Sequence, residues 1–131
     1  MQLESPFLVA PGPALDLVAT THDVAATTSR LYHRDGWSVI EITGELDIQG
    51  VPSVRRLRLR AGPRVLFDLR GVTFIDCSGL RAISGPDAFG RPSCVFVCGT
   101  TGRARLLLEL FGADWGLSFY ASVDEALQAR V

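Results

Sequence analysis

The chain has 131 residues, of which 47% are hydrophobic and 21% are charged, proportions that are ordinary for one globular domain. Its formal net charge of −1 at pH 7 gives no basic excess, so we expect no nucleic-acid partner. All 13 basic residues are arginine, which excludes a phosphate-binding lysine and a Schiff-base lysine in this chain.

Residues 1–26 are rich in proline and alanine and lack the basic start of a signal peptide. We expect them to form an irregular leader, with the folded domain spanning residues 27–131. No apolar stretch reaches the length of about 18 residues that a membrane-spanning helix needs. The sequence therefore predicts a cytoplasmic protein with no membrane partner.

A β-hairpin is the first regular structure that the sequence predicts. Residues 28–33 and 37–43 alternate apolar and polar side chains on either side of the Asp35–Gly36 turn pair. Pro52 then suits the first turn of a helix. The predicted helix is decorated by Arg55, Arg56, Arg58 and Arg60. These arginines form either a solvated helix face or a patch that meets an acidic partner.

Strands and helices alternate in the second half of the chain. The predicted elements are a strand at 63–69, a short helix from about Gly79 that Gly85–Pro86 stops, a strand at 94–98, a helix from 100 to 111, a strand at 116–120 and a helix from 122 to about 128. This order predicts an α/β fold, with a mixed sheet of about five strands and about four helices packed against it.

The three cysteines do not predict a disulfide framework, because their number is odd. Cys94 and Cys98 lie four residues apart in an apolar run, where they are expected to be small buried side chains. His22 and His33 stand in unrelated places. We therefore predict neither a metal site nor a cofactor.

Residues 71–81, GVTFIDCSGLR, form the most conspicuous polar cluster. An apolar strand ends at Asp76, and Cys77 and Ser78 follow at the start of the next predicted helix. The free N–H groups of a helix start favour an anion, and Ser78 is a suitable N-cap residue. This helix start is the candidate functional site.

The segments ITGELDIQGVPSVR, RVLFDLRGVTFIDCSGL and CGTTGRARLLLELFGADWGLSFYASVDEAL resemble, in this order, the STAS domain of bacterial anti-sigma factor antagonists. The resemblance runs from about Thr28 to Ala129. Its most specific parts are the G-E-L-D turn at 44–47 and the D-L-x-x-V-x-F-I-D-x-S-G-L run at 68–80. It implies the STAS fold and a binding module that is not an enzyme.

In that family the antagonist binds a kinase-like anti-sigma factor and thereby releases a sigma factor to direct transcription. The kinase phosphorylates a hydroxyl residue directly after the aspartate, and a phosphatase resets this partner switch. The resemblance therefore places regulation at Cys77 and Ser78. The partner contacts that it implies are Asp47, Ile48, Gln49, Asp76, Gly79, Leu80 and Arg81, although Asp47 is equally explained by turn chemistry.

Cys77 departs from the family, because it stands where the phosphoacceptor is usually serine or threonine. Three hypotheses follow. Phospho-control is lost; or Cys77 is a thiol switch, which a helix start favours and Asp76 opposes; or phosphorylation moves to Ser78. A catalytic nucleophile is not expected, because no histidine is adjacent in the sequence.

The missing phosphoacceptor also motivates an alternative function. Some STAS domains are adaptor subunits of larger assemblies, such as lipid-transport ATPase complexes or stress-sensing particles, without partner-switch phosphorylation. A neighbouring kinase-like gene would favour the antagonist, and a transport operon would favour the adaptor.

Overall fold

The computed structural model describes residues 16–22, 27–84, 94–97, 105–110 and 118–130. Within these ranges the chain forms one six-stranded mixed sheet, in the order β1-β2-β3-β4-β5-β6, and four helical segments. The predicted α/β class, the mixed sheet and the four helices are confirmed. The expected number of about five strands is wrong, because one strand lies in the segment that was expected to be irregular.

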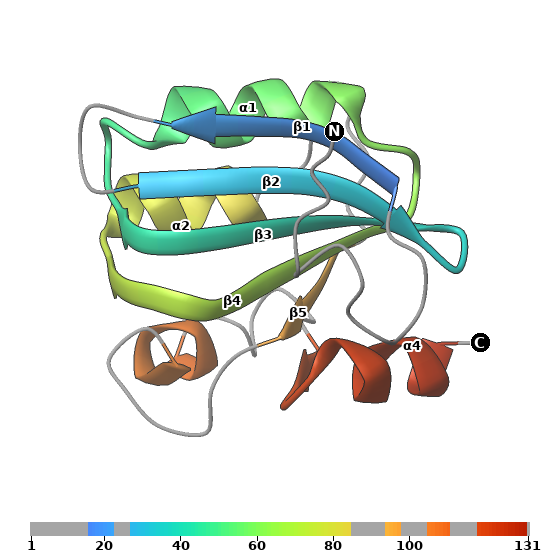
Figure 1. Cartoon of the computed structure of the whole chain (residues 1–131). Coiled ribbons are helices and arrows are strands. Elements are labelled where there is room, and N and C mark those ends of the chain that lie inside the picture. Colours follow the sequence, from blue (N-terminus) through green and yellow to red (C-terminus); the bar gives the residue numbers. More distant parts are fainter. Residues whose placement is uncertain (1–15, 23–26, 85–93, 98–104, 111–117, 131) are drawn as a thin grey trace, which may run out of the picture.

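The elements follow one another in the order that Figure 1 shows. The strands are β1 (Asp16–His22), β2 (Thr27–Arg34), β3 (Trp37–Leu46), β4 (Val65–Ile75), β5 (Cys94–Val97) and β6 (Phe119–Tyr120). The helices are α1 (Val51–Arg60), α2 (Cys77–Ser84), residues 105–110 and α4 (Val123–Arg130). Strands β1, β2 and β3 are antiparallel neighbours, and the pairs from β3 to β6 are parallel.

Strand β1 corrects the prediction of an irregular leader at 1–26. It pairs with β2 from Asp16, opposite His33, to His22, opposite Thr28. An edge strand obtains its hydrogen bonds from the open edge of its neighbour, so it needs little sequence pattern of its own. Residues 1–15 and 23–26 lie outside the described residues.

The β2–β3 hairpin is confirmed. Asp35 and Gly36 both have positive φ, 53° and 81°, as a two-residue turn of this hand requires. The capping signal at the last helix is also confirmed, because the Glu125 N–H donates to the Ser122 hydroxyl oxygen at 3.1 Å. Cys98 and the predicted ends of the helix at 100–111 lie outside the described residues.

Helices cover both faces of the sheet. One apolar cluster joins α1, α2 and the helix at 105–110 to strand residues such as Ile40 and Phe67. A second cluster joins α4 to the opposite face, where Val39 and Leu66 point. In Figure 1, α1 and α2 accordingly lie behind the sheet. Within the described ranges, no helix is long and apolar enough to cross a membrane.

The arginines of α1 do not all lie on one solvated face. Arg55, Arg56 and Arg60 are exposed, but Arg58 is only 6% exposed. Its Nη1 donates to the Ala82 carbonyl oxygen of α2 at 2.9 Å, and its guanidinium lies 5.5 Å from the centre of the Phe67 ring. The solvated interpretation is therefore wrong for Arg58, which links the two helices to the sheet.

Candidate partner-binding site at the start of helix α2

The candidate site lies where strands β3 and β4 end. Their last residues, Leu46 and Ile75, are neighbours in a parallel ladder. The Asp76 N–H continues this ladder by donating to the Leu46 carbonyl oxygen at 3.3 Å. The turn that leads from β3 to α1 and the start of α2 therefore lie beside each other at one end of the sheet.

Asp76 is the N-cap of α2. Its Oδ1 accepts the Gly79 N–H at 2.9 Å and the Ser78 hydroxyl at 2.6 Å. Its own carbonyl oxygen accepts the Leu80 N–H at 2.9 Å, which closes the first turn. The expectations that Ser78 caps this helix and that the helix begins near Gly79 are therefore wrong: the turn starts directly after β4, so Ser78 already lies within it.

These hydrogen bonds also control the ionisation of Asp76. Burial alone would raise the pKa of this carboxyl group, but the hydrogen bonds from the Ser78 hydroxyl and the Gly79 N–H outweigh burial. As a result, the pKa of Asp76 lies below its ordinary value. The helix start therefore carries a carboxylate at neutral pH.

The depressed pKa of Asp76 predicts a pH-dependent stability. The ionised Asp76 carboxylate stabilises the folded chain. This stabilisation is fully present above a pH of about 3.9, the pKa of aspartate in an unfolded chain. It is lost as the pH falls through the lower pKa that Asp76 has in the folded chain. Replacing Asp76 with asparagine removes this contribution, so we expect the variant to be less stable at pH 7 by about 0.5 kcal/mol, a value kept small because solvent reaches the site.

The difference between wild type and Asp76→Asn should shrink as the pH is lowered from 5 towards 2, which urea unfolding at each pH would measure. Asp35→Asn is the matched control, because Asp35 is exposed in the hairpin turn and makes the same chemical change there. An Asp76→Asn curve parallel to the wild-type curve would contradict the prediction.

The two regulatory candidates differ in exposure. Cys77 is a free, exposed thiol at the first position of α2. Ser78 is half-buried, and its hydroxyl is engaged by the Asp76 carboxylate. A modifying reagent or a partner therefore meets Cys77 before it meets the oxygen of Ser78.

Gly79 and Leu80 were expected to contact the partner, but both are buried. A Cβ atom at Gly79 would lie only 2.3 Å from the Leu46 carbonyl oxygen and 2.8 Å from Leu46 Cγ. The Leu80 side chain is 5% exposed and packs in the core with Ile75. These two residues therefore hold α2 against the sheet, which is a positioning role.

The turn after β3 presents side chains at the same end of the sheet. Asp47 Oδ1 accepts the Gln49 N–H at 3.0 Å, and the Asp47 carbonyl oxygen accepts the Gly50 N–H at 3.0 Å, so Asp47 does serve the turn. Ile48 is 71% exposed, and Gln49 is exposed as well. The name "α2-start surface" is used below for Asp47, Ile48, Gln49, Asp76, Cys77 and Arg81.

Comparison with protein families gives a match to the STAS domain over residues 28–126. The chain belongs to the STAS domain family. The resemblance carried by the segments at 44–47 and 68–80 is thereby confirmed.

Two solved structures are similar to this STAS domain. One is an anti-sigma factor antagonist from Mycobacterium paratuberculosis, with 24% sequence identity and a TM-score of 0.65, over 79% of this chain and 92% of that chain. The other is the anti-sigma factor antagonist SpoIIAA in its unphosphorylated form, with 17% identity and a TM-score of 0.50, over 89% and 96%. At these identities the likeness shows a shared fold. A search of the curated proteins found no match.

The Asp68 carboxylate of this STAS domain has a structural role. Asp68 is 3% exposed, and its oxygens accept the Arg70 Nε–H at 2.9 Å and the Arg70 Nη2–H at 2.8 Å. The hydrogen bonds that the Arg70 guanidinium donates to Asp68 raise the pKa of Arg70. Asp68 is therefore a buried carboxylate on β4, paired with the exposed Arg70 and away from the α2-start surface.

One exposed apolar residue near the site was not predicted from the sequence. Phe74 on β4 is 42% exposed and lies opposite Glu45, one residue before the strand end. Alternation along the strand could not have indicated it, because a register shift separates Val72, which packs against the core, from Phe74. Phe74 adds apolar area near the end of the sheet that carries Ile48.

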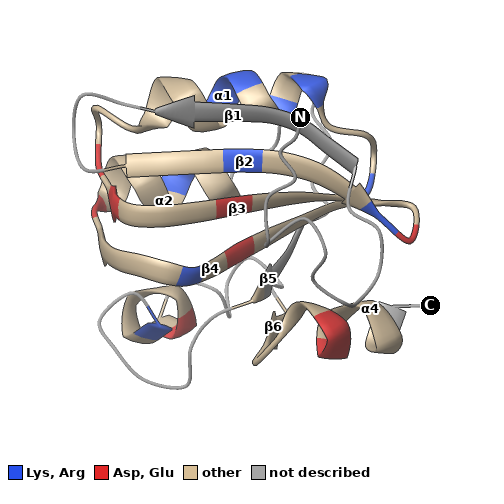
Figure 2. Cartoon of the chain, viewed as in Figure 1, with Lys and Arg blue, Asp and Glu red and all other residues tan. Residues whose placement is uncertain are grey.

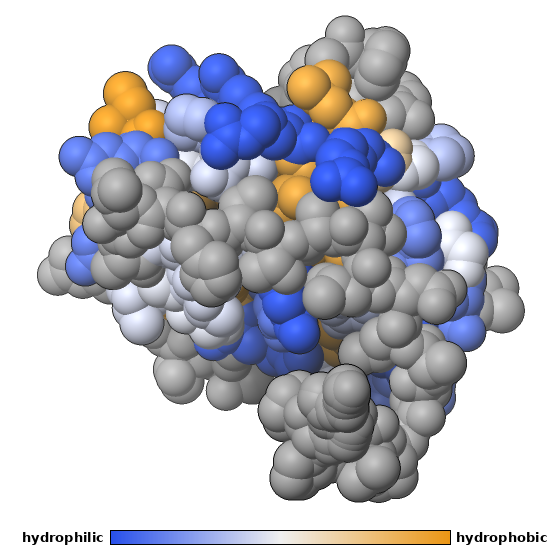
Figure 3. Space-filling model, turned by 45° about the horizontal axis from the view of Figure 1, so that its top comes forward, coloured by the Kyte–Doolittle hydropathy of each residue, from blue (hydrophilic) through white to orange (hydrophobic). Residues whose placement is uncertain are grey.

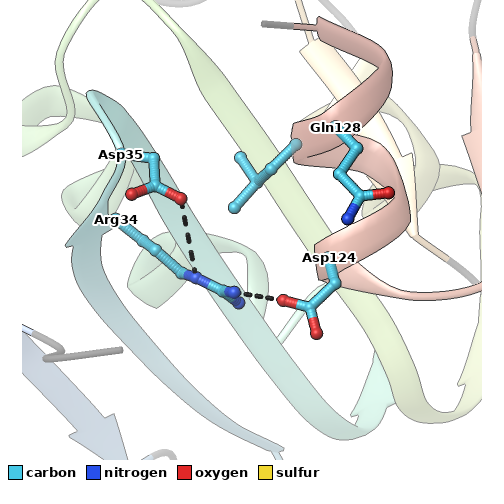
Figure 4. A pocket seen from close by; sticks show the side chains of 5 residues that line it. Arg34, Asp35, Asp124 and Gln128 are labelled. Atoms are coloured by element: carbon cyan, nitrogen blue, oxygen red, sulfur yellow. Dashed lines mark hydrogen bonds and ion pairs between the residues drawn. The ribbon is translucent and has the colours of Figure 1, made fainter. Parts of the chain in front are cut away.

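A small cavity lies at the other end of β3, between the hairpin turn and α4 (Figure 4). It has a volume of about 210 Å³ and is lined by Arg34, Asp35, Asp124, Leu127 and Gln128. Arg34 forms ion pairs with Asp124 and, at 4.0 Å, with Asp35, so each lining carboxylate is paired with the same guanidinium. In the part of the chain that the structure describes, no cluster of three or more metal-ligating residues occurs.

Proposed function

We propose that this STAS domain is an anti-sigma factor antagonist that binds a kinase-like anti-sigma factor and thereby frees a sigma factor. The observation that carries the proposal is the α2-start surface, where an exposed thiol and an exposed isoleucine flank a capped helix start. Both similar solved structures are described as anti-sigma factor antagonists, which supports the same role. The chain acts by binding, not by catalysis.

The α2-start surface suits a protein partner. Burial of the exposed Ile48 side chain would contribute up to about 2 kcal/mol, because apolar area leaves water. Cys77 has a small side chain and is exposed, so the partner can approach the helix start closely. A charged group at position 77 would have to lose its water when the partner binds, and a bulky group would hold the partner away, so either would weaken binding.

The geometry also bears on the three regulatory hypotheses. The Ser78 hydroxyl donates to the ionised Asp76 carboxylate, so a phosphate on Ser78 would place about two negative charges beside a third. It would also remove the hydrogen bond that orients the N-cap. Ser78 is therefore a poor acceptor in this chain, and control by phosphate is lost or is replaced by modification of the Cys77 thiol.

A charged substitution at Cys77 tests the surface. Cys77→Glu should weaken binding of the anti-sigma factor at least about tenfold without unfolding the chain, since an acidic residue in the first helical turn favours the helix. Ser78→Glu should act in the same direction. Calorimetric titration measures the affinity, and Cys77→Ser, which is nearly the same size, is the control that retains it. Unchanged affinity of Cys77→Glu would rule out this surface.

Cys77→Ser also separates the regulatory hypotheses. With the anti-sigma factor and ATP, this variant should gain a phosphate on residue 77, whereas the wild type should not be phosphorylated on Ser78. Mass spectrometry of the peptide spanning 71–81 locates the phosphate. A phosphate on Ser78 of the wild type would overturn the regulatory part of the proposal.

The partner itself is identified by affinity capture from a lysate of the source cell, with reduced and peroxide-treated chain as baits. Recovery of a kinase-like anti-sigma factor is the expected result, and its loss after oxidation would indicate that Cys77 is the switch. Recovery of transporter or large-particle subunits would instead favour the adaptor, which the absence of a hydroxyl at Cys77 also fits.

A further inference from the structure

Helices α1 and α2 share an unusual charge pattern. They pack against each other on one face of the sheet, and neither contains an acidic residue. Figure 2 shows blue arginine segments along α1, without red ones. The exposed basic side chains of the two helices are Arg55, Arg56, Arg60 and Arg81, called the arginine face below.

This positive charge is local. The whole chain has a net charge of −1, so the arginine face is balanced by acidic groups elsewhere on the molecule. Arg56 and Arg60 stand four residues apart, a spacing at which like charges destabilise a helix by about 0.2 to 0.5 kcal/mol. The carboxyl end of the helix favours a cation in the last turn, where Arg60 stands, but it gives no such reason for Arg55 and Arg56 in the middle of the helix.

An apolar side chain interrupts the arginine face. Leu59 is 53% exposed and lies between Arg56 and Arg60 along the surface of α1. Figure 3, which turns the side of α1 forward, shows a band of strongly hydrophilic side chains with small hydrophobic areas beside it. Charged residues around a partly exposed leucine are typical of the rim and centre of a protein interface.

The arginine face and the α2-start surface lie on two helices that pack against each other, and Arg81, one helical turn after Cys77, is counted in both. We infer that the arginine face binds an acidic surface of the anti-sigma factor, so that the partner covers α1 as well as the start of α2. This inference rests on the proposed function and adds the charge of the partner. Exposed charges of this kind mainly accelerate association.

A protein fits the arginine face better than a nucleic acid or a membrane does. A nucleic acid or an anionic membrane extends beyond these two helices. There it would be repelled by the acidic groups that give the chain its net charge of −1. An acidic patch on a folded partner is limited in extent, and its carboxylates match the forked guanidinium group.

The test compares two double variants with equal changes in net charge. Arg55→Gln/Arg56→Gln removes charge from the arginine face. Arg30→Gln/Arg64→Gln is the control, since those guanidiniums lie over Tyr32 and Trp37, which belong to the cluster on the α4 side of the sheet. The association rate with the captured anti-sigma factor is measured for each at low and high salt.

We expect the association rate of Arg55→Gln/Arg56→Gln to fall about three- to tenfold at low salt, and the control to change less than about twofold. High salt should remove most of the difference, because the screening length shortens from about 10 Å at 0.1 M to about 3 Å at 1 M. Equal losses in both variants, or a loss that salt does not change, would overturn the inference.

A second measurement separates this inference from the proposed function. Labelled poly-L-glutamate is titrated with the full chain, alongside a single-stranded oligonucleotide and vesicles of phosphatidylglycerol. If Arg55→Gln/Arg56→Gln binds poly-L-glutamate more weakly than the wild type and the control variant does not, the arginine face is supported. This result holds even where the capture yields no anti-sigma factor and the proposed function fails. The inference would be overturned if the wild-type chain bound the oligonucleotide or the vesicles more tightly than poly-L-glutamate, or did not bind poly-L-glutamate.

Discussion

Replacing Gly79 with alanine is expected to lower the free energy of unfolding by about 1 to 3 kcal/mol. The added Cβ would lie 2.3 Å from the Leu46 carbonyl oxygen, which is backbone and cannot rotate away. Either α2 or the end of β3 must then move. Helix propensity alone would make alanine more stable than glycine here by about 1 kcal/mol. A net loss of stability would therefore be caused by the clash.

Urea unfolding followed by circular dichroism measures the loss, and Gly62→Ala is the matched control. A Cβ atom at Gly62 would lie 3.5 Å from the Ser38 hydroxyl oxygen, an ordinary contact, so that variant should be neutral or slightly more stable. The Gly79→Ala chain should also bind its partner more weakly, because its α2-start surface is displaced. Equal stability of the two variants would contradict the positioning role of Gly79.

Replacing Arg58 with alanine is expected to cost about 2 to 4 kcal/mol. The substitution removes a buried side chain from between α1, α2 and the sheet, and it leaves the Ala82 carbonyl oxygen without its donor at the last turn of α2. The favourable interaction of a cation with the carboxyl end of a helix is lost as well. Arg58 thus fixes the far end of the helix whose start forms the candidate site.

A series of variants separates these contributions. Arg58→Met retains most of the buried stem but not the donor, so it should lose less than Arg58→Ala does. Arg55→Ala on the exposed side of the same helix should stay within about 0.5 kcal/mol of the wild type. Thermal and urea unfolding measure all three. A loss for Arg58→Ala no larger than that for Arg55→Ala would show that the buried link is unimportant.

The features that local chemistry determines could be predicted from the sequence. The hairpin turn follows from Asp35–Gly36, because few other residue pairs tolerate two positive φ values. The start of the last helix follows from Ser122 and Glu125. The family follows from two short segments.

The features that depend on distant neighbours could not be predicted in the same way. The cap of α2 is Asp76 and not Ser78, because the exact end of β4 is set by pairing with Leu46. The burial of Gly79 likewise depends on the approach of β3. Arg58 is a partial exception: it lies four residues after Val54 and three before Ala61, on the buried stripe, but its charge suggested solvent exposure.

Strand β1 has a consequence for handling the protein. The family match begins at residue 28, so a chain trimmed to that boundary would lack β1 and would expose the outer edge of the eight-residue strand β2. An uncovered edge of this length offers unpaired N–H and C=O groups to another molecule, which is a common cause of aggregation. The segment before the family boundary therefore protects solubility, and shortened versions should retain residues 16–22.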